Sequence, residues 1–314
     1  MYSCYKPLVI IEGFSLNLSS KYATIYCMRK LYLLAVALLM AAPAFAQDGK
    51  QGWQVELKKL AFDLTSTEIK HAKDYKNFSD ARLNSDSQTS VRGAWDSIAD
   101  YHAEHFVWTN QLLMDYGRTK IRPVEGETLT NENADRILVQ TGYTQRLWHV
   151  NDFLGGFEVG PFATVGYETE FTKPHHAPRT RIWRGTAGMK LFDGKYIKKF
   201  HVAIVGERDL TYNPHSNKLA WETALELEAP VREGVTFKTG ALFRDYLDES
   251  ERQPNDLDWE FAADARLDVQ LYKNLYVAPF ISYYTAQGKY IGPRGENVYV
   301  GVSFSFSHIF SEAK

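Results

Sequence analysis

Apolar and polar residues alternate with a period of two along most of the chain after Gln47. In the segment 153–171, for example, Phe157, Val159 and Tyr167 lie on one face, and Glu158 and Glu168 lie on the other. This period is typical of β-strands that have one apolar and one polar face. Long stretches with helical periodicity are absent from the same region. The pattern therefore predicts an all-β protein.

Twelve segments carry this alternation, at 53–64, 88–101, 106–120, 136–148, 153–171, 179–192, 200–212, 218–229, 235–247, 257–271, 275–286 and 297–310. The connections between them are alternately short and long. If the first strand starts at a short-turn end, every short connection falls at that end, and so do both ends of the chain. This arrangement predicts a transmembrane antiparallel up-and-down β-barrel of about 12 strands.

Aromatic residues recur near both ends of the predicted strands. Phe157 and Tyr167 are ten residues apart on one face, and Trp183, Trp221 and Trp259 each occur early in a strand. A tilted strand crosses the hydrocarbon core of a bilayer in roughly 9–11 residues. A soluble sandwich can also alternate, with its charges in water. The aromatic bands favour a barrel whose apolar face contacts lipid, with two aromatic girdles.

Four features fit this pattern poorly. Asn110 falls on the predicted lipid face in mid-strand. Pro161 and Pro279 lack the amide hydrogen that a central strand uses, so we expect a bulge at each. The first strand changes phase between Leu57 and Leu60.

The first 46 residues have a different composition. Arg29 and Lys30 precede an apolar run, Leu31–Ala46, that ends in small residues. This is typical of a secretory signal peptide, here residues 28–46. Residues 1–27 are then expected to be an over-extended start, and residues 47–314 the barrel. The alternative is a single anchoring helix, but the run is short for spanning a bilayer and contains Pro43.

The final strand "NVYVGVSFSFSHIF" alternates up to Phe310. Together with the signal sequence and the twelve segments, it resembles Gram-negative outer-membrane β-barrel proteins over essentially all of 47–314. The resemblance implies a bacterial outer-membrane location with periplasmic termini. It also implies contact with outer-membrane lipid and recognition of Phe306 and Phe310 by the barrel assembly machinery. The tail "SEAK" departs from that family pattern.

The predicted lumen face carries many charges, with an acidic excess. Ten of them are lumen-facing candidates for a functional site: Glu158, Glu168, Glu222, Glu226, Glu260, Asp264, Arg266, Asp268, Arg244 and Lys238. One interpretation is an ion-paired, partly filled lumen that stiffens the barrel. The other is a narrow aqueous pore that favours cations. The formal net charge of −2 gives no indication of a nucleic-acid partner.

Enzymatic and metal chemistry have weak support in the sequence. Some twelve-stranded outer-membrane barrels are phospholipases with a His-x-Ser pair, but here His215 and Ser216 are adjacent and point to opposite faces if extended. His175 and His176 lack a nearby third metal ligand. Both cysteines, Cys4 and Cys27, lie before the predicted barrel. We therefore expect no catalytic residue, metal or cofactor.

Three functions remain open from the sequence. The first is a narrow pore or passive channel for small solutes with a net-acidic lumen. The second is a non-conducting structural or surface-recognition barrel, with the polar segment 65–87 as its candidate binding loop. The third is an outer-membrane lipid hydrolase.

Overall fold

A computed structural model of the chain describes residues 51–75, 78, 83, 88–121, 129–173 and 177–311. The predicted signal peptide, the over-extended start and the "EAK" end of the tail lie outside the described residues. Within the described part, no helix is long and apolar enough to cross a membrane.

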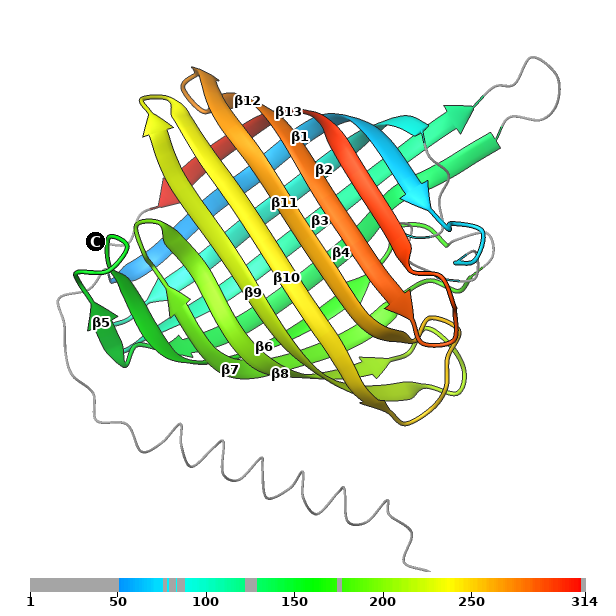
Figure 1. The fold of residues 1–314 in the computed structure, drawn as a ribbon. Helices are drawn as coiled ribbons and strands as arrows, with labels where there is room; N and C mark the ends of the chain where they lie inside the picture. Colours follow the sequence, from blue (N-terminus) through cyan, green and yellow to red (C-terminus); the bar gives the residue numbers. More distant parts are fainter. Residues whose placement is uncertain are drawn as a thin grey trace, which may run out of the picture. The chain divides into compact units, whose positions relative to one another are not determined.

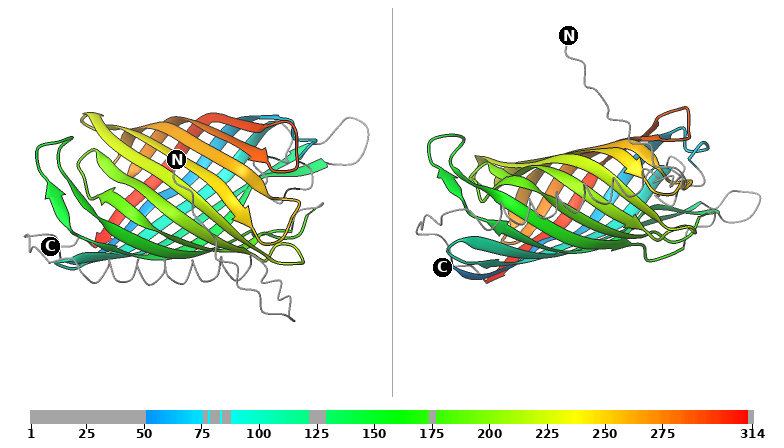
Figure 2. Two further views of the ribbon diagram at one scale, coloured as in Figure 1. Left: turned by 60° about the horizontal axis from the view of Figure 1, so that its bottom comes forward. Right: turned by 90° about the horizontal axis from the view of Figure 1, so that it is seen from below.

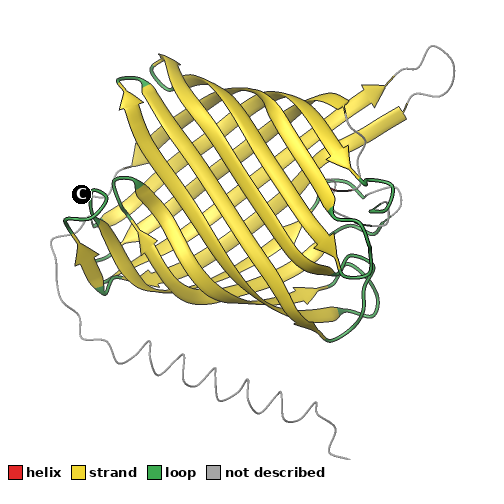
Figure 3. Cartoon of the chain, viewed as in Figure 1, coloured by secondary structure: helices red, strands yellow, loops and turns green. Residues whose placement is uncertain are grey.

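The described chain forms thirteen antiparallel β-strands (Figures 1 and 3). They are β1 (Gly52–Lys70), β2 (Gln88–His102), β3 (Phe106–Ile121), β4 (Leu129–Gln145), β5 (Trp148–Val150), β6 (Phe157–Thr169), β7 (Arg181–Phe192), β8 (Ile197–Asp209), β9 (Ser216–Arg232), β10 (Val235–Glu249), β11 (Leu257–Tyr272), β12 (Leu275–Gly288) and β13 (Gly295–Ser311).

The sheet closes on itself into a barrel. Neighbouring strands in the sequence pair with each other, except that β4 and β5 both pair with β6, and β13 pairs with β1. The short strand β5 continues the line of β4 along β6, so the two together occupy one position in the barrel wall. The barrel therefore has twelve strand positions, which we call staves. In Figure 2 the strands of the near wall cross those of the far wall at a large angle, because the strands are tilted in the barrel. Val55 pairs with Ser311, so both described ends of the barrel lie at the short-turn end.

The predicted all-β barrel is confirmed, but several strand ends differ from the sequence-based prediction. β1 continues to Lys70, so the segment 65–70 is strand, and the first long loop begins at His71. β4 already begins at Leu129, within a segment predicted as loop. Phe153 and Gly155 lie in a turn before β6, and Gly155 has a φ of +78°. Turn geometry at Gly155 therefore ends the alternating pattern earlier than its apolar residues suggested.

The three expected strand irregularities have different outcomes. The phase change between Leu57 and Leu60 is a register shift of β1 against β13. At Pro161, the ladder with β7 keeps its register. The break lies on the neighbouring stave instead, where the pairing with β6 changes register between Gln145 and Trp148. The bulge expected at Pro279 is wrong, because the pairing of β12 with β13 shows no shift there.

The outer surface of the barrel is apolar and bounded by two aromatic bands. Phe62, Leu64, Val165 and Ile204 each expose about half of their surface. A monomeric soluble protein rarely exposes so large an apolar surface. At the short-turn end, the aromatic contacts join Trp53 to Tyr101 and Trp108, and Phe106 to Tyr143. At the long-loop end they join Trp221 to Phe243, Phe243 to Trp259, and Tyr167 to Trp183.

Two polar residues on the outer face have local partners beside the short-turn aromatic band. Asn110 accepts a hydrogen bond from Thr141 (2.9 Å), and Thr141 accepts one from the Trp108 indole (2.8 Å). His308, the exception in the last strand, lies between the rings of Phe306 and Phe310. Its Nδ1 is 2.6 Å from the side-chain amide of Asn274 in the turn between β11 and β12. Both residues therefore suit the membrane interface, where a ring and a hydrogen-bonding group are useful together.

Substitution of Gly160 tests the tight packing where the pairing with β6 changes register. A Cβ added there would lie 1.6 Å from the carbonyl oxygen of Gln145. We expect Gly160→Ala to lower the free energy of unfolding in detergent micelles by about 1–3 kcal/mol, as overpacking does. Urea unfolding followed by tryptophan fluorescence measures this change. The matched control is Gly206→Ala, whose added Cβ meets no atom within 4 Å; an equal loss in both variants would contradict the steric explanation.

Candidate functional site

The inward face of the barrel is polar and encloses a cavity of about 470 Å³. Along β8, every second residue from Ile197 is mostly buried, whereas the residues between are mostly exposed to the outside. The same alternation in the other strands directs their charged residues inward. Nine acidic and six basic side chains line the cavity.

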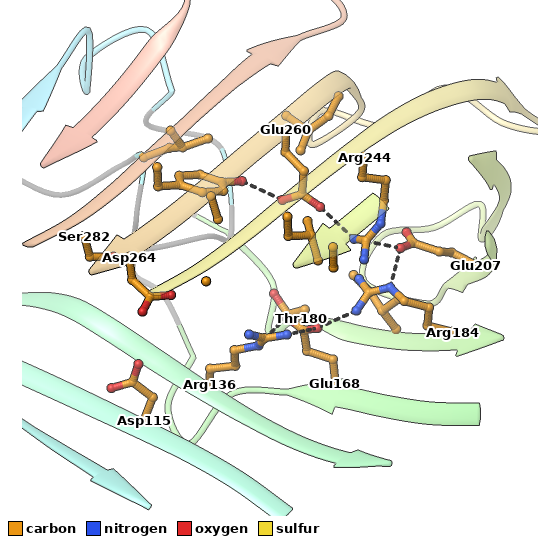
Figure 4. Close-up of a pocket in the computed structure, with 18 of the residues that line it drawn as sticks. Asp115, Arg136, Glu168, Thr180, Arg184, Glu207, Arg244, Glu260, Asp264 and Ser282 are labelled. Carbon is orange, nitrogen blue, oxygen red and sulfur yellow. Dashed lines mark hydrogen bonds and ion pairs between the residues drawn. The ribbon is translucent and has the colours of Figure 1, made fainter. Parts of the chain in front are cut away.

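A chain of ion pairs runs along one wall of the cavity (Figure 4). Glu168 of β6 accepts hydrogen bonds from Arg136 of β4 (3.0 and 3.1 Å) and from Arg184 of β7 (2.9 Å). Arg184 also donates to Glu207 of β8 (2.5 Å). Glu207 lies 3.5 Å from Arg244 of β10. Alternating charges therefore join five staves across the lumen wall.

Arg244 is the branching point of this chain. Its guanidinium donates to Glu222 of β9 (2.6 and 2.9 Å) and to Glu260 of β11 (2.6 Å). Glu222 also lies 3.0 Å from His201 of β8, and Glu260 accepts a hydrogen bond from Tyr284 of β12 (2.9 Å). All of these groups are buried. The network thus satisfies charges that would be costly to leave unpaired in the interior.

The rest of the inner wall carries shorter, separate ion pairs. Arg92 of β2 pairs with Asp115 of β3, and Lys59 pairs with Asp63 within β1 (3.4 Å). On β11, Arg266 pairs with Asp268 (2.5 Å), which also lies 3.3 Å from Lys238 of β10. These charges are therefore largely neutralised within the wall.

Asp264 differs from the other acidic groups of the cavity. It faces the lumen from β11, on the wall opposite Asp115, and it is exposed within the lumen (Figure 4). Its carboxylate has no hydrogen bond or ion pair with any other residue that the structure describes. Gly240 on β10 leaves room for it, since a Cβ there would lie 2.8 Å from an Asp264 carboxylate oxygen. Asp264 therefore presents an accessible negative charge to the lumen.

The described residues of the first long loop pack at the long-loop mouth of the barrel. The hydroxyl of Tyr75 donates to the carbonyl oxygen of Pro293 (2.9 Å) or Ala286 (3.2 Å). It also accepts hydrogen bonds from the backbone amides of Gly288 (3.0 Å) and Gly295 (3.1 Å). Tyr75 is fully buried. One side chain thus ties this loop to the end of β12 and the loop that follows.

Apolar side chains complete this cap. Phe78 and Leu83 are buried, pack with Tyr75 and Tyr284, and line the cavity. The described residues of the loop that carry these side chains therefore point into the barrel, although their segment was the candidate binding loop of the surface-recognition alternative. Alternation along the sequence gives no sign of them, because they lie outside any strand pattern.

The loop between β12 and β13 is itself fastened to the rim. Lys289 donates a hydrogen bond to Glu249 at the end of β10, which raises the pKa of Lys289 above its usual value. Tyr290 of the same loop also donates to Glu249 (3.1 Å).

The structure brings four of the ten sequence-predicted lumen residues into one network. Glu168, Glu222, Glu260 and Arg244 belong to the branched chain of ion pairs, and Asp264 faces the cavity beside it. The remaining residues form separate pairs: Glu226 with Lys199 (3.2 Å), Glu158 with Arg146 (3.4 Å), and Asp268 with Arg266 and Lys238.

Two contributors could not be recognised from the sequence. Arg136 stood at the expected start of its strand, so its face was not assigned. Tyr75 lies in a polar loop with no signal that marks a buried tyrosine. Neither has a motif that could have revealed it.

The histidine and serine considered for catalysis do not form a catalytic pair. His215 Nδ1 lies 2.9 Å from the carbonyl oxygen of Tyr212, and Ser216 donates to the carbonyl oxygen of Glu251 (2.8 Å). Ser216 is fully buried at the start of β9. These residues therefore hold the mouth of the barrel together. His175 and His176 lie outside the described residues.

The closed sheet, the apolar outer surface and the two aromatic bands together decide the class of the fold. The molecule is a twelve-strand β-barrel of the outer-membrane type. No family model and no curated protein matches the sequence.

Among solved structures, the chain is similar to several outer-membrane channels. An outer-membrane channel from Pseudomonas putida F1 has 11% identity and a TM-score of 0.41, over 85% of this chain and 100% of that one. The channel DcaP of Acinetobacter baumannii has 8% identity and a TM-score of 0.39, over 84% and 100%. The porin NanC has 12% identity and a TM-score of 0.36, over 77% and 98%. At these values the likeness carries no information about a solute.

Arg244 tests the energetic role of the ion-pair chain. Arg244→Met leaves Glu222 and Glu260 buried without their main cation. Removal of one partner from a buried pair commonly costs about 3–5 kcal/mol. We expect a loss of this size in the free energy of unfolding, measured by urea denaturation in micelles. The control is Arg232→Met at the exposed end of β9, where little change is expected; similar stability in both variants would contradict the structural role.

Tyr75 tests the inward position of the first loop. Tyr75→Ala removes the hydroxyl that ties the loop to the backbone of residues 286–295. We expect a larger single-channel conductance in planar bilayers, because the mouth loses its cap. Tyr272→Ala serves as the control, since that tyrosine is exposed at the short-turn end of the barrel, away from this loop. An unchanged conductance for a folded Tyr75→Ala barrel would show that this loop does not limit passage.

Proposed function

We propose that this protein is a narrow passive channel for small solutes in the bacterial outer membrane. The observation that carries the proposal is the polar cavity inside the closed barrel. A barrel filled with apolar side chains offers no path for water, whereas this lumen holds water-accessible space bordered by charges. The apolar outer surface suits contact with lipid, so polar solutes could cross only through the polar lumen.

Several features support a narrow path over a wide one. Twelve staves lie between the eight of small filled barrels and the 16–18 of open porins. The Arg184 and Arg244 side chains project into the lumen, and Phe78 and Leu83 cap it at the long-loop end. The passage therefore suits small solutes rather than large ones.

The charge of the lumen supports a preference for cations. Each of the six basic residues that line the cavity has an ion pair with an acid. Asp264 remains as an accessible carboxylate. The bases that attract it are Lys59, Arg266 and Arg92, and each of these pairs with a closer acid. A charged side chain on a pore wall selects ions of opposite sign.

The orientation follows from the two classes of connection. Outer-membrane barrels have short periplasmic turns and longer extracellular loops. The proposal therefore places the capped mouth outside the cell and the described ends of the barrel in the periplasm. Phe306 and Phe310 would then stand at the periplasmic side, where the assembly machinery is expected to recognise them.

Planar bilayer recording tests the proposed channel. We expect discrete, small conductance steps after the purified, folded protein is added. A folded barrel that conducts in neither polarity would overturn the proposal and favour a structural role.

Asp264 tests the preference for cations separately. In a potassium chloride gradient, we expect a reversal potential on the cation-selective side. Asp264→Asn should shift it toward zero, and Asp264→Lys should shift it further toward anion selectivity. Glu233→Gln, in the exposed turn between β9 and β10, removes one carboxylate outside the lumen and should leave the potential almost unchanged. A conducting channel whose selectivity is the same in all variants would refute the role of Asp264 alone.

A further inference from the structure

Two arginines lie on the lipid-facing side of the barrel at its long-loop end. Arg208 of β8 is paired directly with Trp183 of β7. Arg181 lies two residues before Trp183, at the start of β7 and on the same face of the strand. Both side chains are exposed, in step with their exposed apolar neighbours along each strand. Residues at these diagonal positions are close enough for long side chains to meet one ligand.

A third arginine lies beside them in the preceding connection. Arg179 donates a hydrogen bond to the carbonyl oxygen of Phe171 (3.0 Å), and Arg181 donates one to that of Leu210 (2.7 Å). Carbonyl oxygens fix the two guanidinium groups in place but do not neutralise their charge. Among the described residues, none of Arg179, Arg181 and Arg208 forms an ion pair. We call these three residues the outer arginine patch.

The neighbouring acids all face the other way. Glu170 directly follows β6, and Glu207 and Asp209 lie at the end of β8. Their side chains are 5%, 5% and 0% exposed. Glu207 pairs with Arg184 inside the lumen, and Asp209 pairs with Lys218 (3.0 Å). The barrel therefore separates its charges here, with acids directed inward and unpaired arginines directed outward.

This arrangement contrasts with the inner arginines. Arg92, Arg136, Arg184 and Arg244 each have a carboxylate partner within the barrel. An unpaired arginine on the lipid face is costly at the bilayer midplane, and the cost becomes small near the interface. The patch lies at that interface, because Trp183 belongs to the long-loop aromatic band.

We propose that the outer arginine patch binds the phosphate group of a membrane lipid. A guanidinium presents a planar fork of donors that suits phosphate oxygens. The adjacent Trp183 and Tyr167 rings, 5.0 Å apart, provide a surface for the lipid's apolar part. A lipid is the occupant that fits, because the patch is continuous with the apolar outer surface of β7 and β8, where Met189, Val202 and Ile204 are exposed.

The site is distinct from the proposed channel. Its residues point away from the lumen, so the inference does not depend on conduction. It assigns a binding role to three outward-facing arginines that take no part in the ion pairs of the lumen.

Native mass spectrometry of the full, detergent-purified chain tests this site. The probes are diphosphoryl lipid A and the same lipid with both phosphates removed. We expect the wild-type protein to retain the phosphorylated form preferentially. The double variant Arg181→Gln/Arg208→Gln should lower its apparent affinity by about tenfold or more, since hydrogen bonds to charged groups contribute about 1.5–3 kcal/mol each.

Two further variants make the test decisive. Arg252→Gln removes an exposed arginine at the same end of the barrel, stacked on Tyr290 instead, and should leave retention unchanged. Arg181→Lys/Arg208→Lys keeps both charges and should retain part of the affinity. An equal loss with Arg252→Gln would reduce the effect to general electrostatics and overturn the proposal. So would equal retention of the dephosphorylated lipid, or complete displacement by inorganic phosphate at the lipid's own concentration.

Discussion

Complete pairing of polar groups in a nonpolar surrounding is the constraint on which the rest of this structure depends. A bilayer offers no water to an unpaired amide or carbonyl, so a membrane sheet must close. The pairing of β13 with β1 and of β4 with β6 achieves that closure. It also divides each strand into a lipid face and a lumen face, so the apolar residues of the sequence face outward. The inside of the barrel then has to accommodate every remaining charge.

The same constraint explains the charge chain on the inner wall. Charges inside a closed barrel persist at low cost only with partners. The sequence offers acids and arginines on successive staves, at positions where cross-strand neighbours meet. Glu168, Arg184, Glu207 and Arg244 therefore join into one network rather than into two isolated pairs. Such a network holds neighbouring staves in register from the inside, while lipid covers them from the outside.

Much of this fold could be predicted from the sequence, because the alternation of apolar and polar residues with a period of two is a property of each single strand. The positions of Trp183, Trp221 and Trp259 along the chain already indicate one membrane interface. Asp264 and Arg244 could be placed on the lumen face in the same way. Their partners could not be predicted, because pairing depends on register and on side-chain reach across several staves. Tyr75 shows the limit most clearly, since a polar loop gives no sign that it turns inward.

The irregular sites were equally hard to predict. Pro161 signalled a missing amide, but the chain responds on the neighbouring stave, between Gln145 and Trp148. Phe153 and Phe157 are both aromatic, yet only Phe157 lies in a strand. At Pro161 the local signal was correct about the type of irregularity and wrong about its position, and at Phe153 the apolar pattern placed the start of the strand too early. Contacts between staves decided the position.

The tether made by Tyr75 implies an order of assembly. Its partners, Ala286, Gly288, Pro293 and Gly295, come from the last hairpin of the chain, whereas Tyr75 follows the first strand. These ends meet only once β1 has joined β13 at the seam of the barrel. The contact of Tyr75 with this hairpin therefore belongs to the closed barrel and follows the joining of the seam. An open sheet and a finished barrel would differ in whether this contact is made.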